Sequence, residues 1–413
     1  MLKIDEALKM ILAEIRPLGR EIVNIEDSAG RVLAEDITAK RGNPPWDNSA
    51  MDGYALHSAD VAAASGERPV QLKVLYDLPA GGVPEGPVGA GEAVRIMTGA
   101  PTPVGADAVV MVEQTRKAGE NAVEILRPVK LGANIRKKGE DFKEGENVIS
   151  AGTSIRPAEI LMLATMGREK IPVYKRPSVA VVSTGDELVD INVTPAPGKI
   201  TNSNGYALTS LVKDTGAKCV NLGIAGDNRE KLNEKFTEAA EHDLVISSGG
   251  VSVGDYDLVK EVMKDLGSEM KFWKVAMKPG KPLAFGLMGG KPAFGLPGNP
   301  VSSMVAFEQF VRPALLKMAG RSDIFKKTFA ARLTSPIRKK PGRVNFLRGT
   351  LTSKDGEYLA TPLQGQGSGM ITSMVRAEIF IIVPEEATEV EAGEMVMIQP
   401  LGNAALQSNT PGY

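Results

Sequence analysis

The stretch SVAVVSTGD, residues 178–186, decides the fold of the central part of this chain. Its first half is a continuous run of small and β-branched residues, which is the pattern of a strand buried on both faces. The turn Ser183-Thr184-Gly185-Asp186 follows at once. A buried strand that ends in a glycine turn is typical of a parallel α/β sheet, whose ligands bind at the carboxyl ends of the strands.

The same pattern continues beyond this stretch. We expect further strands at residues 220–224 and 244–247, with helices at 206–215, 229–241 and 257–266. Strands at 271–276, 283–286 and 293–295 and a long helix at 300–318 complete the series. Strand, glycine-rich turn and helix in repetition predict a parallel sheet with helices on both faces.

The flanking segments have other patterns. The apolar residues of the first 15 residues are spaced as in an amphipathic helix, and a second helix is expected over 154–166. Short Val- and Ile-rich runs alternate with glycines from about 68 to 150, so this segment is expected to be mainly β. Residues 328–402 show short alternating strands and predict a small β domain, and the tail after Gly402 looks disordered.

Composition excludes several classes of function. Lys and Arg number 49 against 50 Asp and Glu, for a net charge of -1, which argues against general nucleic-acid binding. One cysteine and two histidines make a zinc site of Cys and His ligands or a histidine-based serine triad improbable. Catalysis must then depend on carboxylates, lysines, backbone amides or a hard metal ion, for which Mg²⁺ is the natural candidate.

The sequence also indicates a compartment. Charged residues interrupt the N-terminus where a signal peptide would have its apolar core, and no apolar run reaches the roughly 18 residues of a membrane span. The single Cys219 cannot form an intramolecular disulfide, which fits a reducing compartment. We therefore expect a cytoplasmic protein that does not enter a membrane.

Four loops of the central domain follow predicted strands, at residues 183–187, 247–257, 274–282 and 295–303. Their glycines let backbone amides approach an anion, and their serines and lysines add donors. The loop at 295–303 is also expected to place free amides at the start of the long helix. Lys274 and Lys278 would point to the same side if their strand is regular. Each loop alone could be a plain turn, a helix start or a solvated surface. Together they predict a site for a phosphorylated ligand.

Seven segments make the chain recognisable. They are DNSAMDGYA at 47–55, RIMTGAP at 95–101, GED at 139–141, STGDEL at 183–188, SGGVSVGDYD at 248–257, KPGKP at 278–282 and GLPGNPVS at 295–302. In this order they resemble the molybdopterin molybdenumtransferase family, which includes bacterial MoeA and the C-terminal domain of gephyrin. The resemblance extends from residue 1 to about 400.

The resemblance implies an α/β multidomain architecture. It places an elongated helical or linker region at 1–40 and 146–171, a mainly β domain at 41–145, a molybdopterin-binding α/β domain at 172–322, a C-terminal β-barrel at 323–402 and a tail at 403–413. The implied reaction inserts molybdenum from molybdate into adenylylated molybdopterin with Mg²⁺ and releases AMP. A homodimer with a shared active site and contact with the molybdopterin adenylyltransferase are also implied.

The resemblance carries over a set of site residues. The catalytic positions are Asp52, Asp141, Glu187, Asp227 and Asp257, of which Glu187, Asp227 and Asp257 are the candidate metal ligands. The substrate-binding positions are Thr98, Thr184, Gly185, Ser248, Gly249, Gly250, Ser252, Lys274, Lys278, Pro297, Gly298, Asn299, Pro300, Ser302, Arg348 and Ser368. Pro297 and Pro300 frame the expected molybdate pocket.

Other readings of the same residues remain open at this point. The loops alone permit a nucleotide-sugar enzyme or a phosphotransferase on a similar fold. A non-enzymatic scaffold would need no intact set of Asp and Lys residues. A tungsten-inserting relative cannot be separated from a molybdenum-inserting one, because tungstate and molybdate have nearly the same size and charge.

Overall fold

The computed structural model describes residues 1–250, 261–262 and 264–402. The chain divides into two compact units. The first is Met1–Glu35, Gly152–Ile160 and Glu169–Tyr413, and the second is Asp36–Ala151 and Leu161–Arg168. Within the described ranges, no helix is long and apolar enough to cross a membrane.

A six-stranded sheet forms the centre of the first unit. Its order is β16 (Lys218–Ala225), β13 (Ser178–Thr184), β17 (Leu244–Ser248), β21 (Lys291–Leu296), β20 (Pro282–Met288) and β18 (Glu269–Lys274). The first four strands are parallel, which confirms the α/β fold. The last two are antiparallel to their neighbours, so the sheet is mixed. Between β20 and β21 the turn Gly289-Gly290, with φ of 57° and 78°, reverses the chain without a crossover helix, so these two strands are antiparallel.

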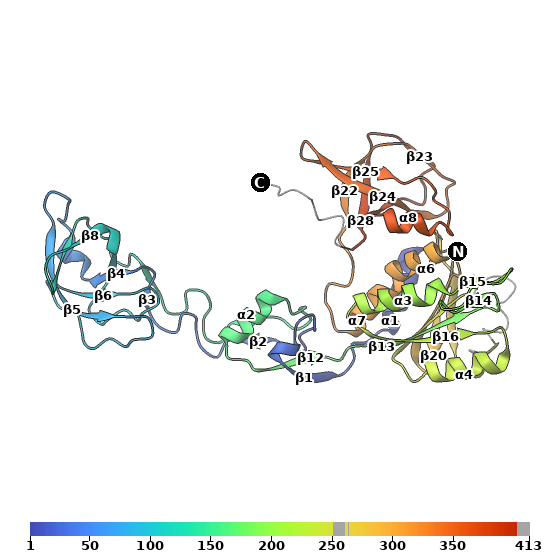
Figure 1. Ribbon diagram of the computed structural model, residues 1–413, viewed down its shortest axis with the longest axis horizontal. Helices are drawn as coiled ribbons and strands as arrows, with labels where there is room; N and C mark the ends of the chain where they lie inside the picture. The colour runs from blue at the N-terminus through green and yellow to red at the C-terminus, as the bar shows by residue number, and fades with distance from the viewer. Residues whose placement is uncertain (251–260, 263, 403–413) are drawn as a thin grey trace. The chain divides into compact units, whose positions relative to one another are not determined.

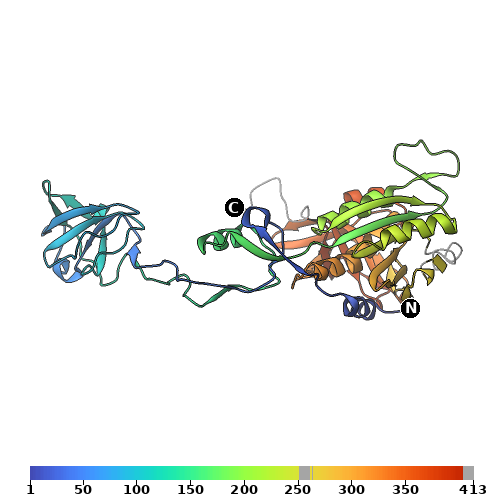
Figure 2. The ribbon, with the colours of Figure 1, turned by 90° about the horizontal axis from the view of Figure 1, so that it is seen from below.

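Helices cover both faces of this sheet (Figure 1 and Figure 2). Val179 and Val181 of β13 share one apolar core with α1 (Ile4–Glu14), α3 (Ser203–Asp214), α6 (Pro300–Ala306) and α7 (Arg312–Met318). Ala180 and Val182 pack in a second core with α4 (Arg229–Ala239). Successive strand residues point to opposite faces, so a strand buried on both faces has no polar alternation.

The helix limits follow from local chemistry. Asn228 caps α4, with its side chain accepting from the amides of Glu230 and Lys231. In the same way Asn202 caps α3, so this helix begins at Ser203, before the expected position 206. The helix expected at 300–318 is continuous but contains a π turn over Phe307–Val311. Pro313 follows this turn and lacks the amide that a regular helical hydrogen bond needs.

The C-terminal domain is a closed barrel of five strands. The ring runs from β24 (Val344–Lys354) through β25 (Glu357–Pro362), β22 (Phe329–Leu333), β28 (Met395–Pro400) and β26 (Ile379–Val383) back to β24. The short pair β23 (Ile337–Arg338) and β27 (Glu389–Val390) and the helix α8 (Ile371–Arg376) accompany it. The closure leaves these five strands without open edges, and it confirms the expected barrel.

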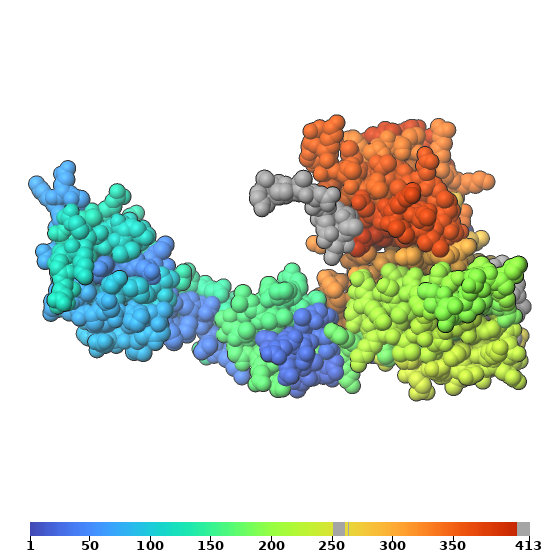
Figure 3. Space-filling model, in the orientation of Figure 1, coloured from blue at the N-terminus to red at the C-terminus, as the bar shows by residue number. Residues whose placement is uncertain are grey.

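The barrel packs against the α/β domain (Figure 3). Phe346 and Phe380 of the barrel belong to the core that α1, α3, α6 and α7 share. The amide group of Gln309 donates to Gln399 Oε1 at 2.6 Å. The strand β19 (Met277–Lys278) leaves the α/β domain and pairs in parallel with β24. These contacts bring the loop after β18 against the barrel.

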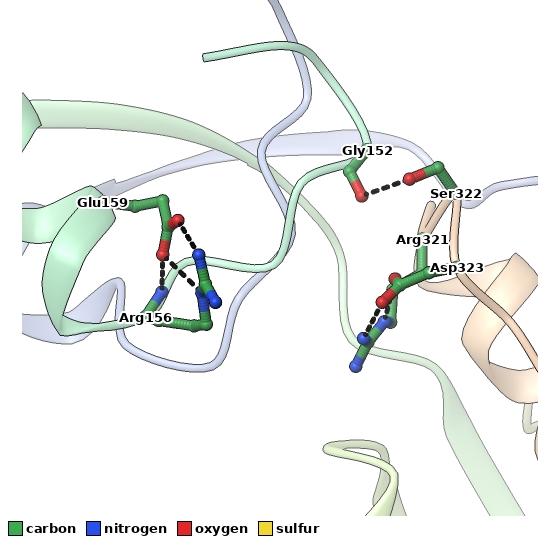
Figure 4. A network of polar contacts seen from close by, with 6 residues as sticks. All are labelled: Gly152, Arg156, Glu159, Arg321, Ser322 and Asp323. Carbon is green, nitrogen blue, oxygen red and sulfur yellow. Dashed lines mark hydrogen bonds and ion pairs between the residues drawn. The ribbon is translucent and has the colours of Figure 1, made fainter. Parts of the chain in front are cut away.

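A polar network joins two further parts of the first unit (Figure 4). Arg156 and Glu159, near the start of α2 (Pro157–Thr165), form an ion pair with N–O 2.6 Å, and hydrogen bonds from Arg156 lower the pKa of Glu159 to about 2. The Ser322 hydroxyl donates to the carbonyl of Gly152 at 3.3 Å. Close by, β1 (Arg20–Asn24), followed by the 3-10 turn Ile25–Asp27, pairs with β12 (Lys170–Tyr174). The bond from Ser322 to Gly152 ties the residues that follow α7 to the segment that precedes α2.

The second unit is mainly β, as expected for this segment. Its six-stranded sheet has the order β7 (Ala108–Met111), β4 (Gly53–Leu56), β6 (Glu92–Ile96), β5 (Val70–Leu78), β9 (Ala122–Ile125) and β8 (Thr115–Lys117). The pairs β3 (Asn48–Ser49) with β10 (Ile135–Arg136) and β2 (Ile37–Thr38) with β11 (Asn147–Ile149) and the 3-10 turns Ser58–Val61 and Val112–Gln114 complete it. Two apolar cores pack within this unit.

Candidate functional site

A cavity of about 350 Å³ opens at the carboxyl edge of the mixed sheet. It is lined by residues 183–184, 187–188, 200–204, 248–250, 282 and 297–300, and is called the central cavity below. The loops after β13, β17 and β21 all reach it. Because β18 and β21 are both antiparallel to β20, they run in the same direction and end at the same edge of the sheet. The loop after β18 therefore begins at this edge. The described parts of the four predicted loops therefore converge on one edge.

Nine of the predicted substrate and catalytic positions line the central cavity. They are Thr184, Glu187, Ser248, Gly249, Gly250, Pro297, Gly298, Asn299 and Pro300. Thr184 and Ser248 are almost wholly buried, with 2% of each residue exposed, and Glu187 is exposed. The cavity thus combines buried hydroxyl groups at its base with a carboxylate at its rim.

Two glycines are needed for this geometry. Gly249 has φ 94°, and a Cβ there would stand 2.4 Å from the carbonyl oxygen of Thr184. Gly185 has φ 142°, and a Cβ there would stand 2.4 Å from Glu187 Oε2. Any side chain at either position would collide with the neighbouring loop or displace the carboxylate. Gly249 therefore lets the ends of β13 and β17 approach closely, and Gly185 leaves room for the carboxylate of Glu187.

Two asparagines of this site were missed in the sequence. Asn204 Nδ2 donates to Ser248 Oγ and to the carbonyl of Gly298, both at 2.8 Å. Asn202 Oδ1 accepts from Ser183 Oγ at 2.9 Å as well as from the amide of Gly205 at 3.0 Å. Asn204 therefore joins the loops after β17 and β21. The sequence did hold a signal for Asn204. Asn is a favoured helix cap, and recognising Asn202 as the cap of α3 would have placed Asn204 in the first turn of that helix, at the cavity.

A second pocket, of about 520 Å³, adjoins the first. It is lined by residues 277–282, 299, 302, 343 and 366–368 and is called the lysine pocket below. It brings together the predicted Lys278, Ser302 and Ser368, and it adds Lys281 and Arg343. None of the described residues that line it is acidic. Pro282 and Asn299 line both cavities, so an anion in the lysine pocket would lie next to a ligand in the central cavity.

The two lysines of the third loop are separated rather than paired. Lys274 ends β18 in the α/β sheet, while Lys278 belongs to β19 at the barrel, with a bend at Ala276 between them. The two side chains were expected to share a side only if one regular strand carried both, and this condition is not met, because the chain changes sheets within four residues. Lys278 lines the lysine pocket, and Lys274 is not among the lining residues of either cavity.

The start of α6 also differs from the expectation of free amides. The amide of Val301 donates to the carbonyl of Ser368 at 3.1 Å, and that of Ser303 donates to the carbonyl of Asn299 at 3.0 Å. The first of these bonds links the helix to the barrel loop 366–368. These two amides are therefore structural, and the cations Lys278, Lys281 and Arg343 are among the donors that the lysine pocket offers to an anion.

Arg348 lies behind the lysine pocket and does not line it. The residue is fully buried, and its Nη2 donates to the carbonyls of Gly365 and Gly367 at 3.1 and 3.0 Å. Its Nε donates to Ser373 Oγ at 3.1 Å. Burial lowers the pKa of this guanidinium, because the charged form is taken out of water. Arg348 thus holds in place the barrel loop that carries Ser368.

The carboxylates after β13 and β16 form a clasp. The amide of Asp186 donates to Asp227 Oδ2 at 3.2 Å, and the amide of Asp227 donates to Asp186 Oδ1 at 2.9 Å. Asp227 is not among the lining residues of the central cavity, whereas Glu187 is. Over the described ranges there is no group of three Asp, Glu, His or Cys side chains placed to hold a metal ion. Ser252 and Asp257 lie outside the described residues.

Three predicted residues lie in the second unit. Asp52 Oδ1 accepts from the amide and the hydroxyl of Thr98 at 2.7 and 2.8 Å. These hydrogen bonds, the amide first, lower the pKa of Asp52. Asp141 Oδ2 accepts from Asn43 Nδ2 at 3.0 Å. All three are exposed, so the pairing of Asp52 with Thr98 stabilises a charged carboxylate at the surface.

Comparisons with known proteins decide the family. Three family descriptions match in order: the MoeA N-terminal region (domain I and II) at residues 2–167, a probable molybdopterin binding domain at 180–317 and the MoeA C-terminal region (domain IV) at 330–401. The molybdopterin molybdenumtransferase of a Nostoc species is 39% identical over 92% of this chain and 88% of its own length. The chain belongs to the molybdopterin molybdenumtransferase family.

Other members of the molybdopterin molybdenumtransferase family agree over almost the whole chain. That of Haemophilus influenzae is 36% identical over 98% of this chain and 99% of its own length. The solved structure of the molybdopterin biosynthesis MoeA protein from Pyrococcus horikosii has a TM-score of 0.81 at 34% identity, covering 97% of this chain and 99% of that one. The region matched as a molybdopterin binding domain contains every residue that lines the central cavity.

Proposed function

We propose that this chain is a transferase of molybdenum cofactor biosynthesis, which inserts molybdenum from molybdate into adenylylated molybdopterin and releases AMP. The observation that carries the proposal is the pair of adjoining cavities with Pro282 and Asn299 in common. One is lined by glycines, hydroxyls and amides, and the other by cations. Two anionic substrates that must react need two such sites side by side.

The residues of the chain would divide the work between the cavities. In the central cavity, Ser248 and the backbone amide of Gly250 would hold phosphate oxygens, with Asn204 fixing the loop positions. Pro297 and Pro300, which were expected to frame the molybdate pocket, line the central cavity, and we place molybdate beside it in the lysine pocket. There Lys278, Lys281 and Arg343 would hold this tetrahedral oxyanion. Holding both substrates in neighbouring sites lowers the entropy cost of bringing them together.

Mg²⁺ is part of the proposal, with Glu187, Asp227 and Asp257 as its carboxylate ligands. Carboxylate oxygens are the donors that Mg²⁺ prefers, and it commonly uses one or two of them together with substrate phosphates. Glu187 at the rim of the central cavity fits that role, and Asp227 follows the neighbouring strand β16. The ion would neutralise charge on phosphate oxygens that the nearby carboxylates otherwise repel.

An insertion assay tests this function directly. Purified protein, adenylylated molybdopterin and Mg²⁺ are mixed with molybdate or, separately, with tungstate, and formation of the metal-bound cofactor and of AMP is measured. We expect both products to appear together and to depend on molybdate. Absence of metal-bound cofactor under conditions in which a related MoeA is active would overturn the proposal, and a preference for tungstate would redirect it to that metal.

We further propose a homodimer with a shared active site, contact with the molybdopterin adenylyltransferase and a cytoplasmic location. The support is the family resemblance, together with the presence of Asp52 and the central cavity in different compact units. We expect Asp52→Ala and Glu187→Ala subunits, each inactive alone, to recover part of the activity when combined in heterodimers. Heterodimers that form but remain inactive would contradict a site shared between subunits.

A further inference from the structure

One wall of the central cavity is formed by a protruding segment, residues 188–201, which we call the flap. It leaves the cavity along β14 (Leu188–Val189) and returns along β15 (Ile200–Thr201), and the two strands pair in parallel. Leu188, Ile200 and Thr201 line the cavity, while residues 190–200 are exposed. The flap therefore contributes to the cavity through its two ends, and its middle part lies in solvent.

Few polar contacts hold the flap against the domain. At its base the amide of Ile200 donates to the carbonyl of Glu187, and the amide of Asn202 donates to the carbonyl of Val189, both at 2.8 Å. Lys199 Nζ donates to the carbonyl of Asp186 at 2.5 Å. These bonds fix the ends of the flap. They do not fix the part between Asp190 and Gly198.

A single side-chain pair anchors that part. The Tyr206 hydroxyl donates to Asp190 Oδ1 at 2.7 Å, and the same oxygen accepts from the amide of Ile191 at 2.7 Å. Among the hydrogen bonds of the described residues, no other joins residues 190–198 to the chain outside the flap. Tyr206 lies on α3, the helix whose first turn carries Asn204. The pair therefore connects the flap to the helix that orders the cavity.

The pKa values of Asp190 and Tyr206 are both shifted in the direction that favours this hydrogen bond. The hydrogen bond from Tyr206 is the main reason that the pKa of Asp190 is lowered, and the same bond raises the pKa of Tyr206. At neutral pH the phenol thus stays a donor and the carboxylate stays an acceptor. A charged acceptor makes a stronger hydrogen bond than a neutral one.

We propose that Tyr206 and Asp190 are positioning residues that hold the flap against the central cavity and so set how long the molybdopterin ligand is retained. The inference rests on the proposed function, since it takes molybdopterin as the occupant of this cavity. Neither side chain lines the cavity, so both act on the ligand through the flap. Loss of the pair should affect binding of the ligand and leave the chemical step unchanged.

The experiment compares Tyr206→Phe, Asp190→Ala and Asp190→Asn in the full-length protein. We expect the first two to speed the dissociation of molybdopterin, followed by its fluorescence, and to raise the KM for its adenylylated form by about three- to tenfold, the range of one solvent-exposed hydrogen bond. The kcat should not change. Asp190→Asn keeps an oxygen acceptor but loses its charge, so it should fall between the wild type and Asp190→Ala. The double variant Tyr206→Phe/Asp190→Ala should be no worse than either single variant.

Hydrogen exchange of the ligand-free protein gives an independent readout. Amides of the flap should exchange faster in Tyr206→Phe, but not in the control Tyr358→Phe, which alters another exposed tyrosine, on the barrel. Unchanged flap exchange, or effects of the two single variants that add in the double variant, would overturn the anchor. If the wild type itself bound no molybdopterin, the proposed function would fail, and exchange alone would decide whether the anchor exists.

Discussion

Lys278→Ala is expected to raise the KM for molybdate by about 10- to 100-fold while leaving the stability of the fold unchanged. Lys278 is an exposed cation that lines the lysine pocket, with no acidic residue among the described lining residues to neutralise it. A charge-assisted hydrogen bond contributes about 1.5–3 kcal/mol, and each 1.4 kcal/mol or so corresponds to a tenfold change in affinity. The KM for adenylylated molybdopterin should change much less, because that ligand is assigned to the other cavity.

The controls for Lys278 separate a specific contact from a general effect of charge. Lys340→Ala removes an exposed cation that lines neither cavity and should leave the molybdate dependence unchanged. Lys278→Arg keeps the charge and should be intermediate. The loss in Lys278→Ala should also shrink as salt rises, because the pocket is open to solvent and screened. If the KM for molybdate equalled that of the wild type, Lys278 would be a solvent-exposed residue of a turn with no part in molybdate binding.

Arg348→Ala is expected to lower both stability and activity, with a loss of about 3–5 kcal/mol in the free energy of unfolding. The side chain is fully buried, and its removal leaves a void and deprives the carbonyls of Gly365 and Gly367 of their donors. The loop that carries Ser368 would lose its anchor. Calorimetry should therefore show a lower Tm, and the molybdate KM should rise as a consequence.

The pattern of variants distinguishes this role from direct binding of the substrate. Arg348→Lys should rescue little, because one ammonium group cannot reproduce the bonds that two nitrogens of Arg348 make to two carbonyls and to Ser373. Lys278→Ala should leave the Tm unchanged, so calorimetry distinguishes the two variants even if both raise the KM for molybdate. A normal Tm for Arg348→Ala combined with a raised KM for molybdate would show that Arg348 contacts the substrate after all.

The sequence was sufficient to predict those features that depend on residues close together in the chain. The run of Val and Ala before Ser183 predicted a strand buried on both faces, and the glycines after β13, β17 and β21 predicted close approach of the loops to a ligand. The convergence of the loops followed from topology, because the carboxyl ends of parallel strands meet at one edge. The same reasoning placed Thr184, Ser248 and Gly249 together.

Contacts between distant segments could not be predicted in this way. The link from Asn204 to Ser248 and Gly298 spans 44 and 94 residues along the chain. The amide of Val301 is taken by Ser368 of the barrel, although its place at a helix start suggested a free donor. Both depend on which segments the folded chain brings side by side, and a single sequence carries no record of that.

By itself the sequence determined the buried strands, the glycine loops and the supply of carboxylates and lysines, because these depend on hydrophobic periodicity and on the backbone freedom of single residues. Only the tertiary structure decided which cations face a substrate. Lys274 and Lys278, four residues apart, end in different sheets because the chain bends at Ala276. Arg348 is a charged residue yet lies buried, because its guanidinium is hydrogen-bonded to the carbonyl groups of Gly365 and Gly367 in the loop that covers it.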